Sequence, residues 1–214
     1  RYAVDCIKPI QYSSKNLSID PYILGAWLGD GSSGCGAFTC HIDYKEYFQK
    51  RGMNFTTETS HGTNTNTFTS TIKGLTTLLN KSNLINNKHI PLDYLHGSVD
   101  QRIKLLMGLM DTDGFVEKNG TLQIQLSNKN QRLLDDIYLL LCGLGFKVTI
   151  GYYKNTNSTR YSFSTSHEDI VPVGIPHKLI RIKPRLEKRR YVFSRSIKKI
   201  EQIESVPTQC ITVD

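Results

Sequence analysis

Two apolar stretches stand out from the hydrophobic pattern of the chain. They are Tyr22–Gly31, which reads YILGAWLGDG, and Leu105–Gly114, which reads LLMGLMDTDG. Because apolar residues fill nearly every position, each stretch is predicted to form a helix that is buried on more than one side. Each also has two small residues four positions apart, a spacing that allows two helix backbones to approach closely. These residues are Gly25 and Gly29 in the first stretch and Gly108 and Thr112 in the second.

The two stretches align with each other without a gap. Asp30 falls on Asp113 and Gly31 falls on Gly114, at an offset of 113 − 30 = 83 residues, which indicates an internal duplication. Each helix is expected to end in Asp-Gly, with the glycine in the left-handed conformation that is common after a helix C-terminus. Asp-Gly is also an ordinary turn sequence, and a single copy would need no other explanation. Two copies in register favour a shared function.

The position of the two acids is unfavourable unless something binds them. A carboxylate at a helix C-terminus meets the negative end of the helix dipole, at a cost of about 0.3–1 kcal/mol. If the helices pack side by side, Asp30 and Asp113 also repel each other. A divalent cation would remove both penalties, and Mg²⁺ is commonly held by one or two carboxylates together with substrate phosphates.

Shorter periodic segments follow each apolar stretch. After the first we expect a strand, a short helix capped by Asp43, a hairpin and a helix; after the second we expect a strand, a long amphipathic helix and another hairpin. The segments are 37–42, 44–52, 54–72 with a turn at His61-Gly62, and 74–84, then 121–127, 128–144 and 147–165 with a turn at 155–158. This order divides the chain into an extended lead-in over 1–20, two halves over 21–98 and 99–186, and a tail over 187–214.

Polar and aromatic residues alternate along the predicted strands. A two-stranded ribbon fits the major groove of DNA, where short polar and basic side chains reach the base edges. The alternative is an outer sheet face that simply meets solvent. The candidate DNA-contacting residues on these strands are Thr57, Thr59, Thr67, Thr69, Thr71, Gln123, Tyr152, Lys154, Arg160, Tyr161 and Ser162.

The sequence LMGLMDTDG at Leu106–Gly114 resembles the nine-residue motif of the LAGLIDADG homing endonucleases, and ILGAWLGDG at Ile23–Gly31 looks like its diverged first copy. The resemblance implies an α+β fold of two pseudo-symmetric αββαββα halves, packed through the two motif helices and forming a β-saddle for double-stranded DNA. It also implies a monomer in which the last acid of each motif, Asp30 or Asp113, binds metal. Asp111 falls on Leu28, an asymmetry that argues against a paired metal ligand.

The resemblance implies further site residues. The backbone carbonyls of Gly29 and Thr112 would contribute metal ligands, and Lys88 and Lys178 would serve as the lysines beside the metals. A lone lysine in a loop is otherwise most often solvated. Gln125, and His41 as its pseudo-symmetric match, would hold water near the metals. The implied cofactor is Mg²⁺, with Mn²⁺ as a substitute and Ca²⁺ supporting binding without cleavage.

Charge agrees with a polyanionic partner. The chain carries 27 basic and 19 acidic residues, a net charge of +8. Ten of the basic residues lie between 178 and 199, against one acid, so this segment is expected to contact phosphates. A solvated linker is the alternative. The candidate phosphate contacts here are Arg181, Lys183, Lys188, Arg189 and Arg190.

Cysteine content and hydropathy exclude several classes of protein. The five cysteines form an odd set without a C-x-x-C pair, which is typical of a reducing compartment. A zinc site at Cys35, Cys40 and His41 would lack an evident fourth ligand. No apolar run approaches the ~20 residues that span a membrane. We therefore expect an intracellular, cytoplasmic protein that is not secreted, with the nucleus or an organelle as alternative locations. The absence of an initiator methionine indicates a fragment or a processed product.

The two ends add a further resemblance. The segment SIKKIEQIESVPTQCITVD is similar to the part of an intein that resumes the splicing domain after an inserted endonuclease, with 209–214 as a core strand. No nucleophile opens the chain and no His-Asn pair closes it, so self-splicing by this chain alone is not expected. Two alternatives to a homing endonuclease remain: a catalytically inactive, maturase-like nucleic-acid-binding protein, or an element whose main role is protein splicing.

Overall fold

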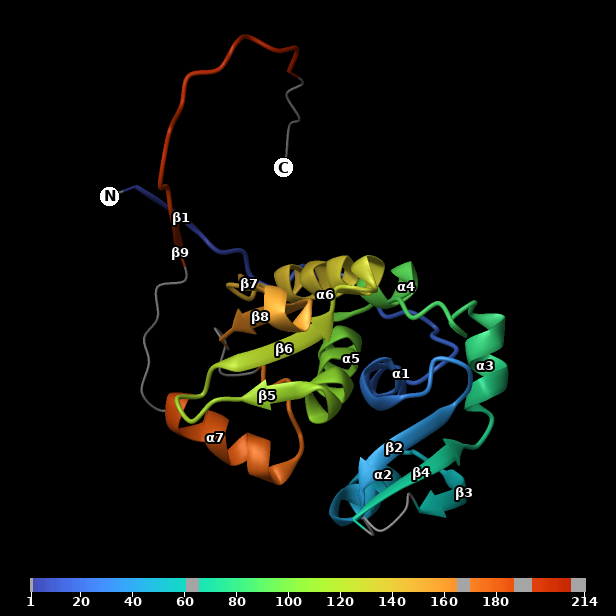
Figure 1. Ribbon diagram of the computed structural model, residues 1–214. Coiled ribbons are helices and arrows are strands. Elements are labelled where there is room, and N and C mark those ends of the chain that lie inside the picture. The colour runs from blue at the N-terminus through green and yellow to red at the C-terminus, as the bar shows by residue number, and fades with distance from the viewer. Residues whose placement is uncertain (1, 61–65, 165–169, 187–193, 209–214) are drawn as a thin grey trace.

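Helices α1 (Pro21–Asp30) and α5 (Val99–Thr112) lie side by side at the centre of the computed structural model (Figure 1). The structure describes residues 2–60, 66–164, 170–186 and 194–208. Asp20 caps α1, since its side chain accepts hydrogen bonds from the backbone N–H of Tyr22 and Ile23. Ser98 and Gln101 form a reciprocal capping box at the start of α5. The two predicted helices are therefore confirmed.

The second half forms a four-stranded antiparallel sheet in the order β5-β6-β8-β7. The chain order is α5, β5, β6, α6, β7, β8, α7, with a short 3-10 helix η2 (Lys154–Thr156) in the last hairpin. The elements are β5 (Gly114–Val116), β6 (Leu122–Ser127), α6 (Gln131–Gly143), β7 (Thr149–Tyr153), β8 (Ser158–Phe163) and α7 (Pro176–Leu186). This half thus has the complete αββαββα order.

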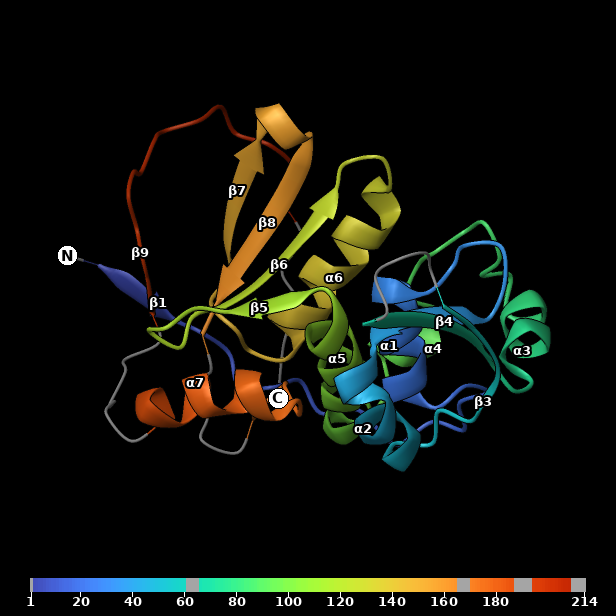
Figure 2. The same cartoon turned by 60° about the horizontal axis from the view of Figure 1, so that its bottom comes forward.

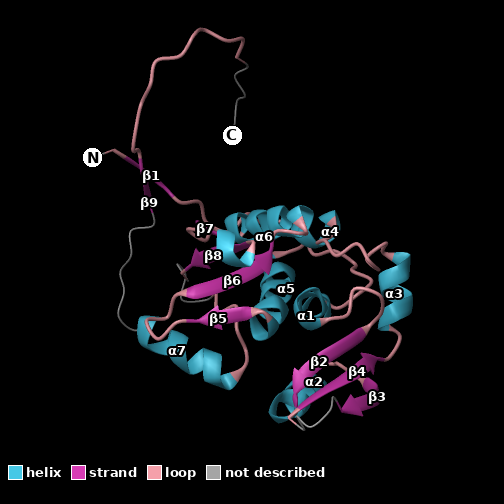
Figure 3. Ribbon diagram, in the orientation of Figure 1, coloured by secondary structure: helices cyan, strands magenta, loops and turns pink. Residues whose placement is uncertain are grey.

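The first half repeats this order with one strand reduced. Its antiparallel sheet has the order β2-β4-β3, and an isolated bridge between Gly31 and Phe38 stands where β5 pairs with β6 in the second half. The elements are β2 (Ala37–His41), η1 (Ile42–Tyr44), α2 (Lys45–Lys50), β3 (Phe55–Ser60), β4 (Thr67–Ile72), α3 (Leu75–Lys81) and α4 (Leu92–Leu95). Figure 3 shows the strands of the two halves on opposite sides of the paired helices. The predicted α+β fold with two halves is confirmed.

Two local predictions were wrong. The side chain of His41, not Asp43, caps the turn that leads into α2, because its Nδ1 accepts from the backbone N–H of Asp43. The long helix of the second half begins at Gln131 and not at 128, because Asn130 is its N-cap and accepts from the backbone N–H of Leu133. The turn predicted at His61-Gly62 lies outside the described residues.

The glycines after the motif acids serve close packing and not a left-handed turn. Gly31 has φ −76° and ψ 150°, an extended conformation that any residue adopts, and Gly114 has no positive φ either. A Cβ at Gly31 would overlap the Trp27 side chain, and a Cβ at Gly114 would come within 2.5 Å of the Met110 backbone. Each glycine lets the chain fold back against the last turn of its own helix, which corrects the prediction of left-handed caps.

The lead-in packs against the second half, although it precedes the first half in sequence. The backbone N–H of Ile10 donates to the carbonyl of Gly143 at the end of α6, and Arg102 of α5 donates to the carbonyl of Ile10. Strand β1 (Ala3–Asp5) pairs antiparallel with β9 (Ser194–Ser196), so the two flanks of the halves run together (Figure 1). None of the described helices has the length and apolar character that crossing a membrane requires.

Candidate active site at the ends of the paired helices

Asp30 and Asp113 stand where α1 and α5 end. Asp30 is the last residue of α1, and Asp113 is the C-cap of α5. Partial burial and the charge of Asp113 raise the pKa of Asp30 to about 6. Burial also raises the pKa of Asp113. The structure therefore brings the two acids together in the strained arrangement that the sequence predicts, with the carboxylates less stable than in water.

Lys88 places its ammonium group on the end of α1. Its Nζ donates to the carbonyl oxygens of Trp27, Leu28, Gly29 and Gly31, at 2.9, 3.0, 3.3 and 2.7 Å. These oxygens carry the negative end of the helix dipole, so the cation is well placed there. Burial lowers the Lys88 pKa to about 8, against the charges of both acids.

Lys178 does the same at the end of α5. Its Nζ donates to the carbonyl oxygens of Met110, Asp111 and Thr112, at 2.8, 2.9 and 3.2 Å. The side chain is almost fully buried, and burial lowers its pKa although Asp111, Asp30 and Asp113 oppose the shift. The structure thus brings the two predicted lysines to equivalent places beside the two acids, even though the local sequences differ.

A cavity of about 260 Å³ opens beside Asp30. It is also lined by His41, Tyr44, His177 and Lys178. The Tyr44 hydroxyl lies 2.9 Å from Nδ1 of His177, and the two rings stack with centroids 5.3 Å apart. His41 therefore lies in the same cavity as Asp30. Tyr44 and His177 are cavity residues that sequence reasoning missed.

Asp111 is buried and fully hydrogen-bonded. Its carboxylate accepts from the hydroxyls of Tyr22 and Tyr47, at 2.9 and 2.7 Å, and from the backbone N–H groups of Gly174 and Ile175, at 2.8 and 3.1 Å. Burial and the nearby charge raise the pKa values of both tyrosines, which keeps them as donors. Asp111 thus joins the two halves. In the sequence, its separate role was indicated only by its alignment with Leu28, which has no carboxylate.

The helix ends offer oxygen atoms suited to a hard divalent cation. Two carboxylates whose pKa values are raised gain from a positive charge, and the carbonyls of Gly29 and Thr112 are adjacent in the chain. Within the described residues, no three His, Cys, Asp or Glu side chains cluster into a metal site. Two carboxylates and the neighbouring carbonyl oxygens suit a hard divalent cation that keeps water in its shell. Cys35, Cys40 and His41, which are among the described residues, do not form such a cluster.

The second-half sheet presents a polar row on one face. Gln125 of β6 lies opposite Arg160 of β8, and Oε1 of Gln125 accepts from Nε and Nη2 of Arg160 at 2.8 and 2.6 Å. The Arg160 guanidinium lies 4.3 Å from the ring centroid of Tyr153. Gln123 and Ser162 pair on the same face, where Gln123 donates to Glu117. Exposed Lys154 lies in the connection between β7 and β8.

Of the predicted DNA contacts on this sheet, Tyr161 is wrong because it is buried, whereas Tyr152 is exposed at a position on the same face. Tyr161 is 4% exposed, and its hydroxyl donates to the carbonyl of Leu134 on α6. Tyr152 pairs with Thr159, whose side chain points to the same face as Tyr161. Thr159, Tyr161 and Phe163 alternate on the face of β8 that is buried in the core, whereas Tyr153 shares the opposite face with Arg160 and its ring contacts the Arg160 guanidinium.

The first-half sheet has a matching row of hydroxyls. Thr67, Thr69 and Thr71 of β4 pair with His41, Thr39 and Ala37 of β2. The other faces of these strands are buried, with Phe38, Cys40 and Phe68 in the core. The Thr39 and Thr69 hydroxyl oxygens are 2.6 Å apart. The side chains of Thr57 and Thr59 lie outside the described residues, although both belong to β3.

The basic residues after Lys178 are only partly described. Arg181 on α7 donates to the carbonyl of Val116 and lies over the ring of Phe115, so it is anchored to β5. The side chain of Lys183, and Lys188, Arg189 and Arg190 altogether, lie outside the described residues.

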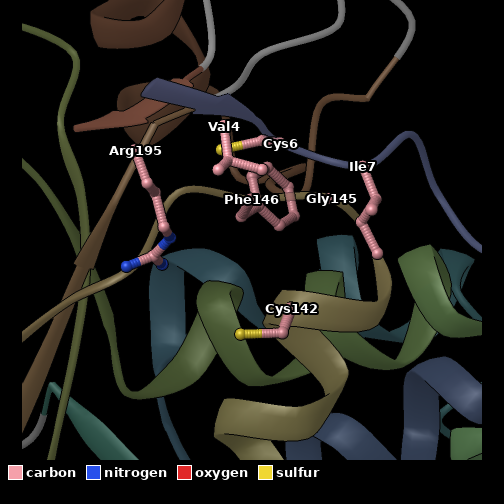
Figure 4. Close-up of a pocket in the computed structure, with 7 residues that line it drawn as sticks. All are labelled: Val4, Cys6, Ile7, Cys142, Gly145, Phe146 and Arg195. Atoms are coloured by element: carbon pink, nitrogen blue, oxygen red, sulfur yellow. The ribbon is translucent and has the colours of Figure 1, made fainter. Parts of the chain in front are cut away.

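A second cavity, of about 230 Å³, lies away from the helix ends (Figure 4). Its lining comes from the lead-in, from the C-terminal end of α6 and from β9. Cys6 and Cys142 line it from opposite sides, together with Phe146 and Arg195. None of the predicted site residues lines this cavity.

Comparisons with known proteins agree with this geometry. Residues 100–198 match a family model described as a LAGLIDADG-like domain. A replicative DNA helicase DnaB of Mycobacterium intracellulare is 31% identical over 213 residues, which are 97% of this chain and 34% of that protein. The chain therefore spans about a third of the length of this relative.

A solved structure shows the same fold. The crystal structure of I-DmoI in complex with DNA and Ca superposes with a TM-score of 0.51 at 17% identity, over 78% of this chain and 97% of that one. A second crystal structure, of I-DmoI in complex with DNA and Mn, gives a TM-score of 0.47 at 19% identity, over 69% and 89%.

Proposed function

We propose that this chain is a LAGLIDADG homing endonuclease that cuts both strands of DNA at a long, asymmetric site. The family model matches its second half, and the fold of I-DmoI covers both halves. The observation that carries the proposal is the pair of helix ends. Each presents one acid, Asp30 or Asp113, and one lysine ammonium group, Lys88 or Lys178.

The acids would hold divalent cations, with the carbonyls of Gly29 and Thr112 as further ligands. A bound Mg²⁺ or Mn²⁺ ion supplies Lewis acidity and lowers the pKa of a bound water. I-DmoI was solved with DNA and Ca, which supports a divalent ion in this family. We place Mg²⁺ here because the site offers few protein ligands and leaves room for water and phosphate.

The lysines supply fixed positive charge beside the reacting phosphodiester. Because carbonyl oxygens hold each ammonium group in place, little reorganisation is needed when negative charge develops on the phosphate. His41, in the cavity beside Asp30, can hold water there, and the family resemblance gives Gln125 the equivalent role in the second half. Each half would cut one strand.

The polar sheet faces would bind the duplex. The first-half face is Thr39, Thr67, Thr69 and Thr71, and the second-half face is Gln123, Gln125, Tyr153, Arg160 and Ser162. Hydroxyl, amide and guanidinium groups on a ribbon can reach base edges in the major groove. The basic residues of 178–199 would add phosphate contacts that depend on salt more than on sequence.

An intein origin is a second part of this proposal. The pairing of β1 with β9 brings the two flanks of the halves together, which suits a domain inserted into another protein. The match to one third of the DnaB helicase supports it.

The test is selection from a random DNA library for sites that the protein cuts in Mg²⁺. Recovered sites would then be incubated with the protein in Mg²⁺, Mn²⁺, Ca²⁺ or EDTA. We expect double-strand cuts in Mg²⁺ and Mn²⁺, binding alone in Ca²⁺ and no cut in EDTA. Specific binding without cutting in any metal would instead identify a maturase-like binding protein.

A further inference from the structure

The two lysines are held in place by different contacts, and each set of contacts reaches into the opposite half. Lys88 lies in the first-half loop between α3 and α4, whereas Lys178 lies in the first turn of α7 in the second half. Both ammonium groups donate to carbonyl oxygens at a helix end. Each lysine reaches these oxygens only if its own backbone is held at the right place, so the contacts of that backbone matter.

The loop of Lys88 is held by helix α6 of the second half. Nδ2 of Asn130 donates to the carbonyl oxygen of Lys88 at 2.7 Å. The carboxylate of Asp136 accepts from the backbone N–H of Ile90 at 2.9 Å. These two hydrogen bonds hold the loop at the residues before and after buried His89.

Helix α7, which carries Lys178, is held against the first half through Asp111. The N–H groups of Gly174 and Ile175, just before α7, donate to the same carboxylate as Tyr22 of α1 and Tyr47 of α2. A Cβ at Gly174 would overlap the Tyr47 hydroxyl and the Arg51 guanidinium, so a larger residue here would displace these two side chains. In Figure 2, α7 and α2 lie on either side of the paired helices.

A second contact braces the same helix. His177, which precedes Lys178, forms a hydrogen bond between its Nδ1 and the hydroxyl of Tyr44 in the first half. The equivalent neighbour of Lys88 is Asn87, which donates instead to the carbonyl of Asn83 within its own loop. The two lysines are thus equivalent in their final position and different in what positions them.

We propose that Asn130 and Asp136 position Lys88, and that Tyr22 and Tyr47, acting through Asp111 of α5, position Lys178, so that each half helps to position the lysine of the other. This inference rests on the proposed function, in which each lysine serves the cutting of one strand. Losing one brace should slow one strand only, because a displacement of about 1 Å can cost on the order of 100-fold in rate. Losing the other brace should slow the opposite strand.

Two nearly isosteric variants test this. Asn130→Asp keeps an oxygen that can cap α6 and replaces the donor to the Lys88 carbonyl with a carboxylate oxygen, which cannot donate. Asp111→Asn keeps one oxygen that accepts from the N–H groups before α7. It replaces the charged oxygen that accepts from the hydroxyls of Tyr22 and Tyr47. Asp135→Asn on α6 and Asp100→Asn on α5 are matched controls, since their partners within the described part of the chain are Gln131 and Lys104 on their own helices.

The measurement uses a duplex of the selected site labelled on both strands, in single turnover, with Lys88→Met and Lys178→Met as references. We expect Asn130→Asp to change the ratio of the two strand rates about tenfold or more, in the direction of Lys88→Met. Asp111→Asn should change it in the direction of Lys178→Met, and the controls should match the wild type. Equal slowing of both strands, or an unchanged ratio in folded variants, overturns the inference.

Hydrogen exchange gives a readout that needs no cleavage. Asn130→Asp should speed amide exchange in 86–91 and leave 174–182 unchanged, and Asp111→Asn should do the reverse. Tyr44→Phe removes the hydroxyl that contacts His177 on α7. It should speed exchange in the same segment as Asp111→Asn, by a smaller factor. If the selection recovers no cut DNA, the proposed function fails. The pattern of amide exchange in the variants still decides how the lysines are positioned. Exchange that rises in both segments with either variant contradicts separate braces.

Discussion

Gly108 of α5 packs directly on Gly25 of α1. A Cβ added at Gly108 would lie 2.6 Å from the backbone nitrogen of Ala26 and 3.1 Å from the carbonyl carbon of Gly25, and it would overlap the carbonyl oxygen of Tyr22. A Cβ at Gly25 would in turn meet the backbone of Leu105 and Leu109. The helices therefore touch backbone to backbone, and their separation sets the distance between the two acids at their ends.

Gly108→Val should separate these helices. We expect a loss of about 1–3 kcal/mol in the free energy of unfolding from overpacking, with a smaller cost in helix propensity. Cleavage should fall further than DNA binding, because Asp113 moves relative to Asp30 and about 1 Å of misplacement can cost on the order of 100-fold. Melting temperature, affinity in Ca²⁺ and single-turnover rate in Mg²⁺ measure the three effects.

Gly34→Val is the matched control for this prediction. Its nearest neighbour would be Oδ1 of Asn86 at 3.9 Å, and its φ is not positive, so the site has room. We expect nearly normal stability and cleavage. A folded Gly108→Val protein that cuts at the normal rate would show that helix separation does not control the acids.

Asp30→Asn and Asp113→Asn should each abolish double-strand cleavage and leave binding nearly intact. The physical reason is that each carboxylate lies at a helix end beside a lysine and would ligate metal, while the base contacts come from the sheets. Gel shift in Ca²⁺ and product formation in Mg²⁺ separate the two activities. The exposed carboxylate of Asp93, changed to Asn, is the control. Full cutting by either motif variant would refute the assignment of these acids.

Local sequence predicted the parts of the site that depend on local spacing. Asp30, Asp113 and the close-packing glycines follow from the repeated stretch itself. The two lysines came from the family resemblance, and the structure places both beside the acids. Asp111 could not be assigned a role, because its partners Tyr22 and Tyr47 are 89 and 64 residues away. The prediction for Tyr161 was wrong because neighbouring strand residues such as Arg160 and Tyr161 point to opposite faces of the sheet, and packing against α6 buries the face of Tyr161.

The register of β7 and β8 predicts which tyrosine binds DNA. Tyr153→Ala should weaken binding, because this ring faces Arg160 on the polar side of the sheet. Tyr152→Ala should have a smaller effect, since Tyr152 points to the other face. Tyr161→Phe should reduce stability by about 0.5–1.5 kcal/mol through its lost hydrogen bond and leave affinity unchanged. Fluorescence anisotropy and thermal melts separate these outcomes, and equal losses of affinity for Tyr152→Ala and Tyr153→Ala would contradict the register argument.

Asp30 should make the metal-free protein sensitive to pH. Its pKa is raised from 3.8 to about 6, so between about pH 4 and pH 6 the folded state binds the proton more tightly than the unfolded chain. The free energy of unfolding in EDTA should therefore fall as pH rises through this window. Asp30→Asn removes that fall, so at pH 8 in EDTA the variant should be more stable than the wild type. Because solvent still reaches the carboxylate, we expect a gain on the order of 1 kcal/mol, or about 2–4 °C in melting temperature.

Adding the cation should reverse this order of stability. A ligand that binds only the folded state stabilises it in proportion to the logarithm of its concentration, so Ca²⁺ should raise the melting temperature of the wild type and do so much less for Asp30→Asn. Melts at pH 4, 6 and 8, with EDTA and with Ca²⁺, give the comparison. At pH 4 the two proteins should have nearly equal melting temperatures in EDTA. Destabilisation by Asp30→Asn at pH 8 in EDTA would show that the carboxylate is not strained by its position, and would remove the electrostatic argument for a metal site at these helix ends.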